Sequence, residues 1–288
     1  MIPAPFALHR PDTVEQACAA LDGHGSDAEV LAGGQSLIAD LKLRRKSPRL
    51  LVDLSSVAGL DGITVEPGRI TIGAMARQAA VVTHPEVSQR LPLLPQVARA
   101  AADPMVRTRG TLVGACCQAA AGGDWVAAAL ALDGTVVIEG GATQRELSLQ
   151  EFVLGEERTA LRPGEIARSL RIPTPGASVV MTYRKVKHVS VGWSVASAAI
   201  VLPTRRGEGR ARIAVSGAVT HPQRLPELES ALADIEPGRS QDIEDAVETA
   251  LAPLEYRGDY YASAAYRKRR LAVLLRRSIT ELVTPSSS

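Results

Sequence analysis

A glycine turn near the N-terminus has the residue types and the spacing that could hold a phosphate group. In the stretch EVLAGGQSLIADLKLR, which begins at Glu29, Gly33 and Gly34 separate an apolar run from an amphipathic one. Glycine lacks a β-carbon, so the backbone can adopt positive φ and approach a ligand closely. The amides up to Ser36 could then converge on an anion at the start of the following helix. A tight strand-to-helix turn that binds nothing is the alternative for this stretch taken alone.

A second small-residue loop, RTRGTLVGA, ends at Ala115. Gly110 and Gly114 flank a threonine in it, and the stretch AAAGGDW follows with Asp124. Small residues again indicate close approach of the backbone to something else. Alone, this loop is better explained by packing. The two loops together could grip one extended cofactor from two sides.

Other binding chemistries lack their residue patterns. GHGSDA, which starts at Gly23, matches the loose dinucleotide pattern G-x-G-x-x-A, but its glycines follow a helix and precede a strand. Pyrophosphate binding requires the reverse order, so we interpret this stretch as a helix C-cap. The three cysteines include no CxxC pair, and the five histidines are scattered. The chain is therefore not expected to hold a metal ion or an iron–sulfur cluster, and Cys116 and Cys117 are interpreted as a packed pair.

Composition narrows the class of protein. The 288 residues, 45% of them hydrophobic, suit two or three packed domains. A formal charge of +2 argues against a general nucleic-acid footprint. No apolar run approaches the roughly 20 residues of a membrane span, and the start of the chain lacks the pattern of a secretory signal. We therefore expect a mixed α/β protein of the reducing cytoplasm, with no membrane span and no nucleic-acid partner.

Alternating helices and strands must position these loops. The first part of the chain predicts a helix capped by Asp12, a strand before the first glycine turn, a helix after it and a second strand, which is a crossover between parallel strands. From Gly62 the pattern predicts a hairpin around Pro67-Gly68 and then helices. Beyond a boundary near Pro175 it predicts strands at 178–186, 195–202 and 212–219, and a last helix at 261–283. One face of that helix carries a repeating stripe that is typical of burial: Leu271, Leu274, Leu275, Ser278 and Leu282.

Six stretches, in this order, resemble the flavin-binding medium subunit of the molybdenum hydroxylases, the group that contains aerobic carbon monoxide dehydrogenase and relatives of xanthine dehydrogenase. LAGGQSLI looks like that family's first FAD pyrophosphate loop, and RITIGAMA resembles its IGA strand. RTRGTLVGACC stands where the family has R-N-R-G-T-I-G-G-N, its second pyrophosphate contact. TALRPGEI and RIPTP resemble the close of the FAD domain. DYYASAAYRKRRLAVLLRRS resembles the terminal helix, where an acidic residue precedes a small-residue stretch and Tyr-Arg.

The resemblance covers nearly the whole chain and implies an α+β fold. A two-subdomain FAD-binding fold of the vanillyl-alcohol-oxidase (PCMH) type would span residues 1–175, with subdomains of about 1–60 and 61–175, and a C-terminal α/β domain would span 176–288. The chain would be the FAD-carrying electron-transfer subunit of a heteromeric molybdenum hydroxylase. A large molybdenum–pterin (molybdopterin) subunit and a small subunit with two 2Fe–2S clusters would be its partners, in a dimer of heterotrimers. Electrons would pass from the 2Fe–2S clusters through FAD to an external acceptor.

The resemblance also carries site residues over, position by position. Backbone amides of the two loops would contact the FAD pyrophosphate, Asp124 would lie near the flavin or its ribityl chain, and Tyr183 and Lys185 would lie close to the isoalloxazine. An exposed strand with an ordinary cation is the alternative for the last two. No catalytic residue and no metal ligand is expected. The residues so predicted to bind FAD are Ala32, Gly33, Gly34, Gln35, Ser36, Leu37, Thr111, Leu112, Val113, Gly114, Ala115, Asp124 and Lys185.

The second loop departs from the family pattern. Val113 replaces a glycine, and a β-branched side chain resists positive φ. Ala115 replaces an asparagine and so removes an amide side chain. A structural subunit of the same complex that has weakened or lost FAD binding is therefore the alternative function. A free-standing flavin oxidase is disfavoured, because 288 residues leave little room for a substrate domain. The basic run from Arg267 to Arg270 is expected to form a solvated helix face.

Overall fold

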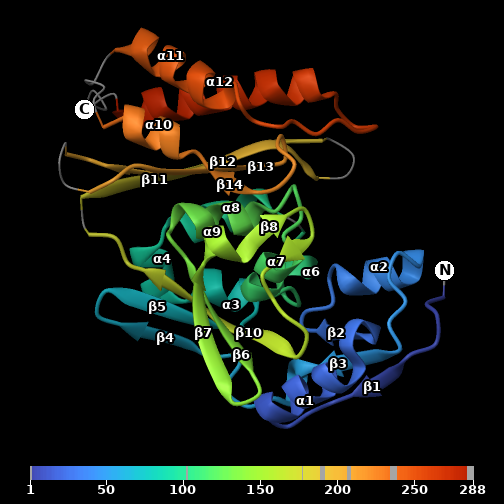
Figure 1. The fold of residues 1–288 in the computed structure, drawn as a ribbon. Coiled ribbons are helices and arrows are strands. Elements are labelled where there is room, and N and C mark those ends of the chain that lie inside the picture. Colours follow the sequence, from blue (N-terminus) through green and yellow to red (C-terminus); the bar gives the residue numbers. More distant parts are fainter. Residues whose placement is uncertain are drawn as a thin grey trace.

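The computed structural model describes residues 2–101, 103–176, 178–188, 192–205, 209–233 and 239–283. The described residues form three sheets of three or more strands, which lie in different parts of the molecule, and one two-stranded sheet (Figure 1). The N-terminal lobe lies at one side, the second sheet lies below a central group of helices, and the C-terminal sheet lies above that group beneath a layer of helices.

The N-terminal lobe is a small parallel sheet with two helices. Its strand order is β1-β3-β2, with both pairs parallel, as the predicted crossover requires. Thr13 caps α1, because its side chain accepts a hydrogen bond from the Gln16 amide, so the prediction of Asp12 as the cap is wrong by one residue. Gly25 ends α1 with φ of 51°, which confirms the helix C-cap assigned to that stretch. The elements of the lobe are β1 (Ala7–His9), α1 (Val14–His24), η1 (Gly25–Asp27), β2 (Ala28–Leu31), α2 (Leu37–Leu43), β3 (Leu50–Asp53) and η2 (Leu54–Ser56).

The second sheet has the order β4-β5-β10-β6-β7, and all of its pairs are antiparallel. The predicted hairpin around Pro67-Gly68 is confirmed, with Gly68 at φ of 81° in the turn. Its strands are β4 (Ile63–Glu66), β5 (Arg69–Gly73), β6 (Thr135–Gly140), β7 (Thr143–Ser148) and β10 (Glu165–Pro173), and β8 (Val153–Gly155) and β9 (Arg158–Thr159) form a separate hairpin.

The central helices stand between this sheet and the next. The alanine-rich helix α8 is buried along its whole length and packs on the C-terminal sheet, which explains its small side chains. The helices are α3 (Gln78–Thr83), α4 (Pro85–Arg90), α5 (Leu93–Ala100), α6 (Pro104–Arg107), α7 (Leu112–Gln118), α8 (Asp124–Ala131) and α9 (Leu149–Phe152).

The C-terminal sheet is covered on both faces, and this explains the continuous apolar run of its second strand. Alternate residues of β12 face different cores: Ala199 and Val201 join the core around α8, whereas Ala198 and Ile200 join the core under α11 and α12. The sheet has the order β11-β12-β13-β14. Its elements are β11 (Val179–Lys187), β12 (Ser194–Pro203), β13 (Arg212–Ser216) and β14 (Gln223–Arg224), followed by α10 (Pro226–Ala231), α11 (Ser240–Leu251) and α12 (Ala264–Val283).

The last helix confirms most of the predicted stripe and overturns one expectation. Its stripe residues are buried, except that Leu282 is half-buried. Arg267 was expected to be solvated with its basic neighbours, but it is only 3% exposed, whereas residues 268–270 are exposed. No helix in the described part of the chain is long and apolar enough to cross a membrane.

Candidate functional site

The two glycine loops, residues 32–37 and 107–115, are in direct contact. A β-carbon built on Gly33 would lie 2.4 Å from the Arg109 carbonyl oxygen and 2.8 Å from the Gly110 α-carbon. Hydrogen bonds from the start of α3 hold the second loop in place. The backbone amide of Gln78 donates to the Gly110 carbonyl at 2.8 Å, and the Arg77 guanidinium donates to the Arg109 carbonyl at 2.5 Å. Only glycine allows this approach, so the folded chain brings together the two loops that the sequence analysis selected.

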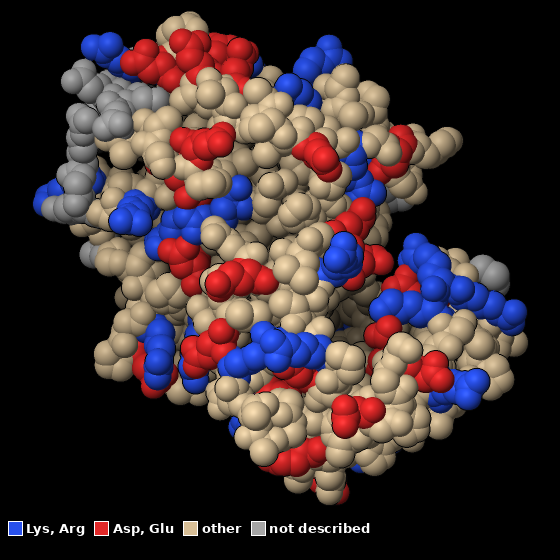
Figure 2. Space-filling model, viewed as in Figure 1, with Lys and Arg blue, Asp and Glu red and all other residues tan. Residues whose placement is uncertain are grey.

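Both loops line one cavity of about 830 Å³. The space-filling view shows a hollow beside the N-terminal lobe, with basic side chains gathered over α2 next to it (Figure 2). Leu112 does not line the cavity and is fully buried, so only its main chain could touch a ligand there. The predicted site residues that do line it are Ala32, Gly33, Gly34, Gln35, Ser36, Leu37, Thr111, Val113, Gly114, Ala115, Asp124 and Lys185.

The first loop leads into the N-terminus of α2. Gly34 has φ of 71°, so this position is restricted to glycine by its backbone conformation. The first amides of a helix have no intrahelical acceptor and carry partial positive charge. The amides that precede Ile38 are therefore suited to an anion.

Charge at this end of the cavity is mixed. Lys46 lines the cavity and pairs with Glu29 at 2.7 Å, and Asp40, which also lines it, accepts from Arg45 at 2.8 Å. The basic side chains around α2 are thus partly neutralised by local carboxylates. The backbone amides remain the main donors for a phosphate.

The second loop is the capped N-terminus of α7. Thr111 caps that helix, its hydroxyl accepting from the Gly114 amide at 3.0 Å. A β-carbon on Gly114 would lie 2.6 Å from the same hydroxyl oxygen, which explains the glycine. Val113 lies inside the helix and is not among the residues with positive φ, so the expected conflict between its β-branched side chain and the backbone does not arise. The Val113 side chain packs in the core instead.

A buried polar cluster borders the cavity where the C-terminal sheet meets α8. Asp124, the first residue of α8, accepts from the Tyr183 hydroxyl at 2.5 Å and from the Lys185 ammonium at 2.7 Å. The side chain of Lys185 is 4% exposed, so the alternative of an exposed strand with an ordinary cation is wrong. Burial and then the charge of Asp124 raise the pKa of Tyr183 well above its usual value, which keeps the phenol a hydrogen-bond donor. Gln96 of α5 fixes this strand, accepting from the Tyr183 amide at 3.0 Å.

Three further lining residues were missed by the sequence analysis. Trp193 is 59% exposed, which places a large aromatic face at the edge of the cavity. Gln78 and Ser194 are buried, and among the residues that the structure describes the Gln78 Oε1 and Ser194 Oγ atoms have no hydrogen-bond partner. Buried polar atoms are rarely left without a partner, and at the wall of a cavity a bound ligand or water can satisfy them. No local pattern marks these three residues, because the cavity that they line is formed by distant parts of the chain.

The cavity with its restricted glycines and unpartnered polar atoms fits an elongated cofactor with a pyrophosphate, a polar chain and an aromatic ring system. It does not resemble a metal centre: within the described ranges, no group of three His, Cys, Asp or Glu side chains could hold a metal ion. Burial raises the pKa of the Cys117 thiol to about 12 and also raises that of Cys116, so both thiols stay protonated. Cys116 is packed in the core, whereas Cys117 is half-buried and lines the cavity.

Comparison with known proteins agrees with this geometry. The family model described as the FAD binding domain in molybdopterin dehydrogenase matches residues 4–175, and the model of the CO dehydrogenase flavoprotein C-terminal domain matches 181–282. The nicotine 6-hydroxylase medium subunit of Paenarthrobacter nicotinovorans is 32% identical over 94% of this chain and 95% of its own length. The carbon monoxide dehydrogenase medium chain of Afipia carboxidovorans is 31% identical over 97% of both chains. The solved carbon monoxide dehydrogenase of Hydrogenophaga pseudoflava that lacks the Mo-pyranopterin moiety superposes with a TM-score of 0.92, at 32% identity, covering 96% of each chain. The fold expected from the sequence is confirmed.

Proposed function

The chain belongs to the family of FAD-binding medium subunits of molybdenum hydroxylases, and on that premise we propose that it holds FAD between its two glycine loops and relays electrons to an external acceptor. One observation carries the proposal. The two loops that resemble the family's pyrophosphate contacts lie against each other and line the same cavity of about 830 Å³.

The residues divide by the part of FAD that they suit. The amides of residues 33–37 and of the start of α7 suit the pyrophosphate, which needs several converging N–H donors. The cluster of Asp124, Tyr183 and Lys185, together with Trp193, offers a buried cation, fixed acceptors and an aromatic face that suit the ring system. FAD, when bound, supplies the redox chemistry.

In this proposal the residues of the chain position the flavin and fix the polar groups around it. The Tyr183 hydroxyl keeps its proton and orients one Asp124 oxygen, and Lys185 neutralises the other. A carboxylate whose oxygens are both engaged in this way has a fixed direction and does not act as a mobile base. The residues therefore tune the surroundings of the ring, and none of them is assigned a catalytic proton transfer.

We further propose the division of labour that the family implies. A large molybdenum–pterin subunit would oxidise the substrate, a small subunit would carry the 2Fe–2S clusters, and residues 1–175 of this chain would hold FAD while residues 176–288 close its cavity. Four cavity-lining residues follow the division, and they support a role for the second part in the site: Lys185, Gly192, Trp193 and Ser194. A dimer of such heterotrimers is the assembly we propose.

The proposal is tested by purifying the assembly from its native host through an affinity tag on this chain and measuring FAD, iron and molybdenum in the same sample. We expect about one FAD per chain, together with iron and molybdenum in the partner subunits. Iron and molybdenum without flavin would instead support the structural-subunit alternative. Flavin in the absence of both metals would contradict the proposed partners.

A further inference from the structure

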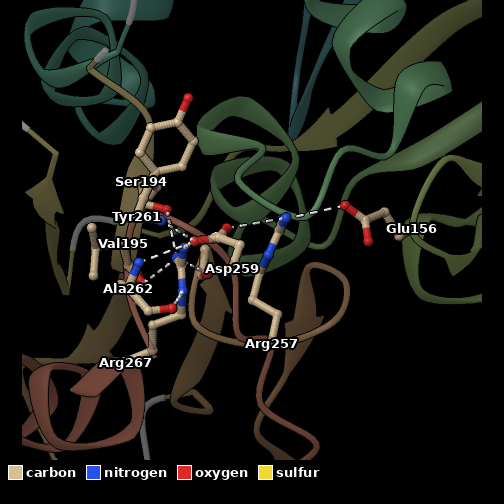
Figure 3. Close-up of polar contacts among 9 residues, drawn as sticks. Glu156, Ser194, Val195, Arg257, Asp259, Tyr261, Ala262 and Arg267 are labelled. Atoms are coloured by element: carbon tan, nitrogen blue, oxygen red, sulfur yellow. Dashed lines mark hydrogen bonds and ion pairs between the residues drawn. The ribbon is translucent and has the colours of Figure 1, made fainter. Parts of the chain in front are cut away.

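Arg267, the buried arginine of α12, is the centre of a cluster of polar contacts (Figure 3). Arg267 donates to both oxygens of Asp259 at 2.7 Å and to the carbonyls of Gly217 at 2.8 Å, Val195 at 3.1 Å and Ser194 at 3.3 Å. A planar guanidinium presents five N–H donors in fixed directions, so it can serve several acceptors at once, and no other side chain does so. One buried cation therefore joins the last helix to the start of β12 and to the turn after β13.

The segments that Arg267 holds are parts of the cavity wall or touch it. Ser194 lines the cavity and directly follows Trp193. Gly217 donates its amide to the Ala121 carbonyl at 2.7 Å, in the loop between α7 and α8. Gly217 has φ of 77°, and a β-carbon there would lie 2.6 Å from the Ser194 hydroxyl oxygen, so the two segments are closely packed. A shift of the Gly217 carbonyl would therefore move the wall.

A second series of contacts joins Asp259, the carboxylate partner of Arg267, to the loop between α7 and α8. Asp259 lies 3.5 Å from Arg257, and Arg257 donates to Glu156 at 3.2 Å, in the turn between β8 and β9. The next residue of that turn, Glu157, donates its amide to the Ala119 carbonyl at 3.1 Å. Burial opposes ionisation of Asp259, but the hydrogen bonds from Arg267 and from the amides of the 261–262 segment hold its pKa below the usual value. The carboxylate is thus charged at neutral pH and fixes the arginine.

We propose that Arg267, fixed by Asp259, is a positioning residue for the cofactor site: it sets the wall formed by Trp193, Ser194 and the loop at 119–121, and thereby the affinity and the redox environment of the flavin. This inference rests on the proposed function, and it assigns a physical role to Asp259 and Arg267, the acidic residue and the arginine of the terminal stretch that resembles the family. Arg267 touches neither loop that would hold the pyrophosphate. Its effect on flavin binding depends on the positions of Trp193, Ser194 and residues 119–121.

The test uses the purified full chain, stripped of flavin and titrated with FAD. We expect Arg267→Met to raise the Kd for FAD by about tenfold or more, the scale on which residues behind a binding group act. The absorption bands and the midpoint potential of the bound flavin should shift as well. Arg267→Lys, which keeps the charge but not the fork of donors, should fall between wild type and Arg267→Met. Arg270→Met is the matched control, because Arg270 is an exposed arginine of the same helix.

Melting curves with and without FAD separate positioning from mere stabilisation. A stabilising role would lower both melting temperatures equally and leave the FAD-induced shift unchanged, and that result would overturn the inference. If Arg267→Met does not fold, Asp259→Asn is used in its place, since it keeps the shape and one acceptor oxygen of the side chain. Wild-type FAD affinity and a wild-type flavin spectrum in Asp259→Asn would also overturn the inference. A wild-type chain that binds no FAD would refute the proposed function itself. Normal wild-type binding that Arg267→Met leaves unchanged refutes only the positioning role.

Discussion

Replacing Gly33 by alanine tests the contact between the two glycine loops. A β-carbon at this position would lie 2.4 Å from the Arg109 carbonyl oxygen and 2.8 Å from the Gly110 α-carbon. Both neighbours are backbone atoms, so no side chain can rotate away. Ordinary contact begins near 3.4 Å, so the loops must separate by about 1 Å. Gly33 does not have positive φ, and the substitution therefore perturbs the contact and not the backbone conformation.

The size of the effect follows from the cost of inserting a methyl group into a packed contact. Such overpacking costs about 1–3 kcal/mol, and each 1.4 kcal/mol changes an equilibrium constant about tenfold. In the variant the loops must move apart from their present spacing, and a pyrophosphate bound by both loops would have to bring them back to it, so the cost should appear in the binding free energy. We expect Gly33→Ala to weaken FAD binding by about 5- to 140-fold.

The assay is an equilibrium titration of the flavin-free full chain with FAD, followed by flavin fluorescence. Gly23→Ala is the matched control, because a β-carbon at Gly23 meets nothing within 4 Å. That variant should bind FAD normally and unfold no more easily than wild type, since alanine is the better helix former. Equal affinity of Gly33→Ala and Gly23→Ala would refute the assignment of the paired loops as the pyrophosphate site.

Other predictions concern the buried cluster and the cysteines. Lys185→Met leaves the buried carboxylate of Asp124 with one partner and should lower the unfolding free energy in chemical denaturation by about 3 kcal/mol. This value is the lower end for a broken buried pair, because Asp124 borders the cavity. A change below about 1 kcal/mol would contradict the prediction. Because the pKa of Tyr183 is raised by burial and by Asp124, the folded chain keeps a proton that the unfolded chain loses, so wild-type stability should fall as pH rises above about 10. Tyr183→Phe should lose that part of the slope, and parallel stability curves would argue against the shift. With its pKa raised to about 12, Cys117 should react slowly with iodoacetamide at about pH 8 until the chain is unfolded. Equal rates in the folded and unfolded chain would contradict the raised pKa.

Much of the fold could be predicted from local patterns. The parallel crossover around the first glycine turn, the hairpin at Pro67-Gly68 and the buried stripe of α12 are all found where periodicity and turn residues indicate them. The cap of α1 was misplaced by one residue because Asp12 and Thr13 are both good caps, and only the hydrogen bond from the Gln16 amide decides between them.

The second loop shows where reasoning by resemblance fell short. The family pattern has a glycine at position 113 and so predicts a loop residue with positive φ, but Val113 lies in the first turn of α7, where a β-branched side chain is tolerated. The Thr111 hydroxyl caps the helix there, and this capping pattern in the sequence could have indicated it. Leu112 was included in the site as part of a continuous loop, and the helix turns its side chain into the core.

Arg267 could have been identified as a core residue. It precedes Leu271 by four residues and Leu274 by seven, so helical periodicity places it on the buried stripe despite its basic neighbours. Its partners could not have been predicted, because they come from the start of β12, from the turn after β13 and from the segment before α12. Trp193 was missed for the same reason, since only the folded chain brings it to the cavity.

The most direct test of the central claim is an experimental structure of the chain, within its assembly, determined with FAD bound. The account predicts that the pyrophosphate lies between the amides of residues 33–37 and the start of α7, with the flavin ring toward Asp124, Lys185 and Trp193. FAD bound elsewhere, or a cavity that stays empty at saturating FAD while the rest of the assembly is intact, would contradict it.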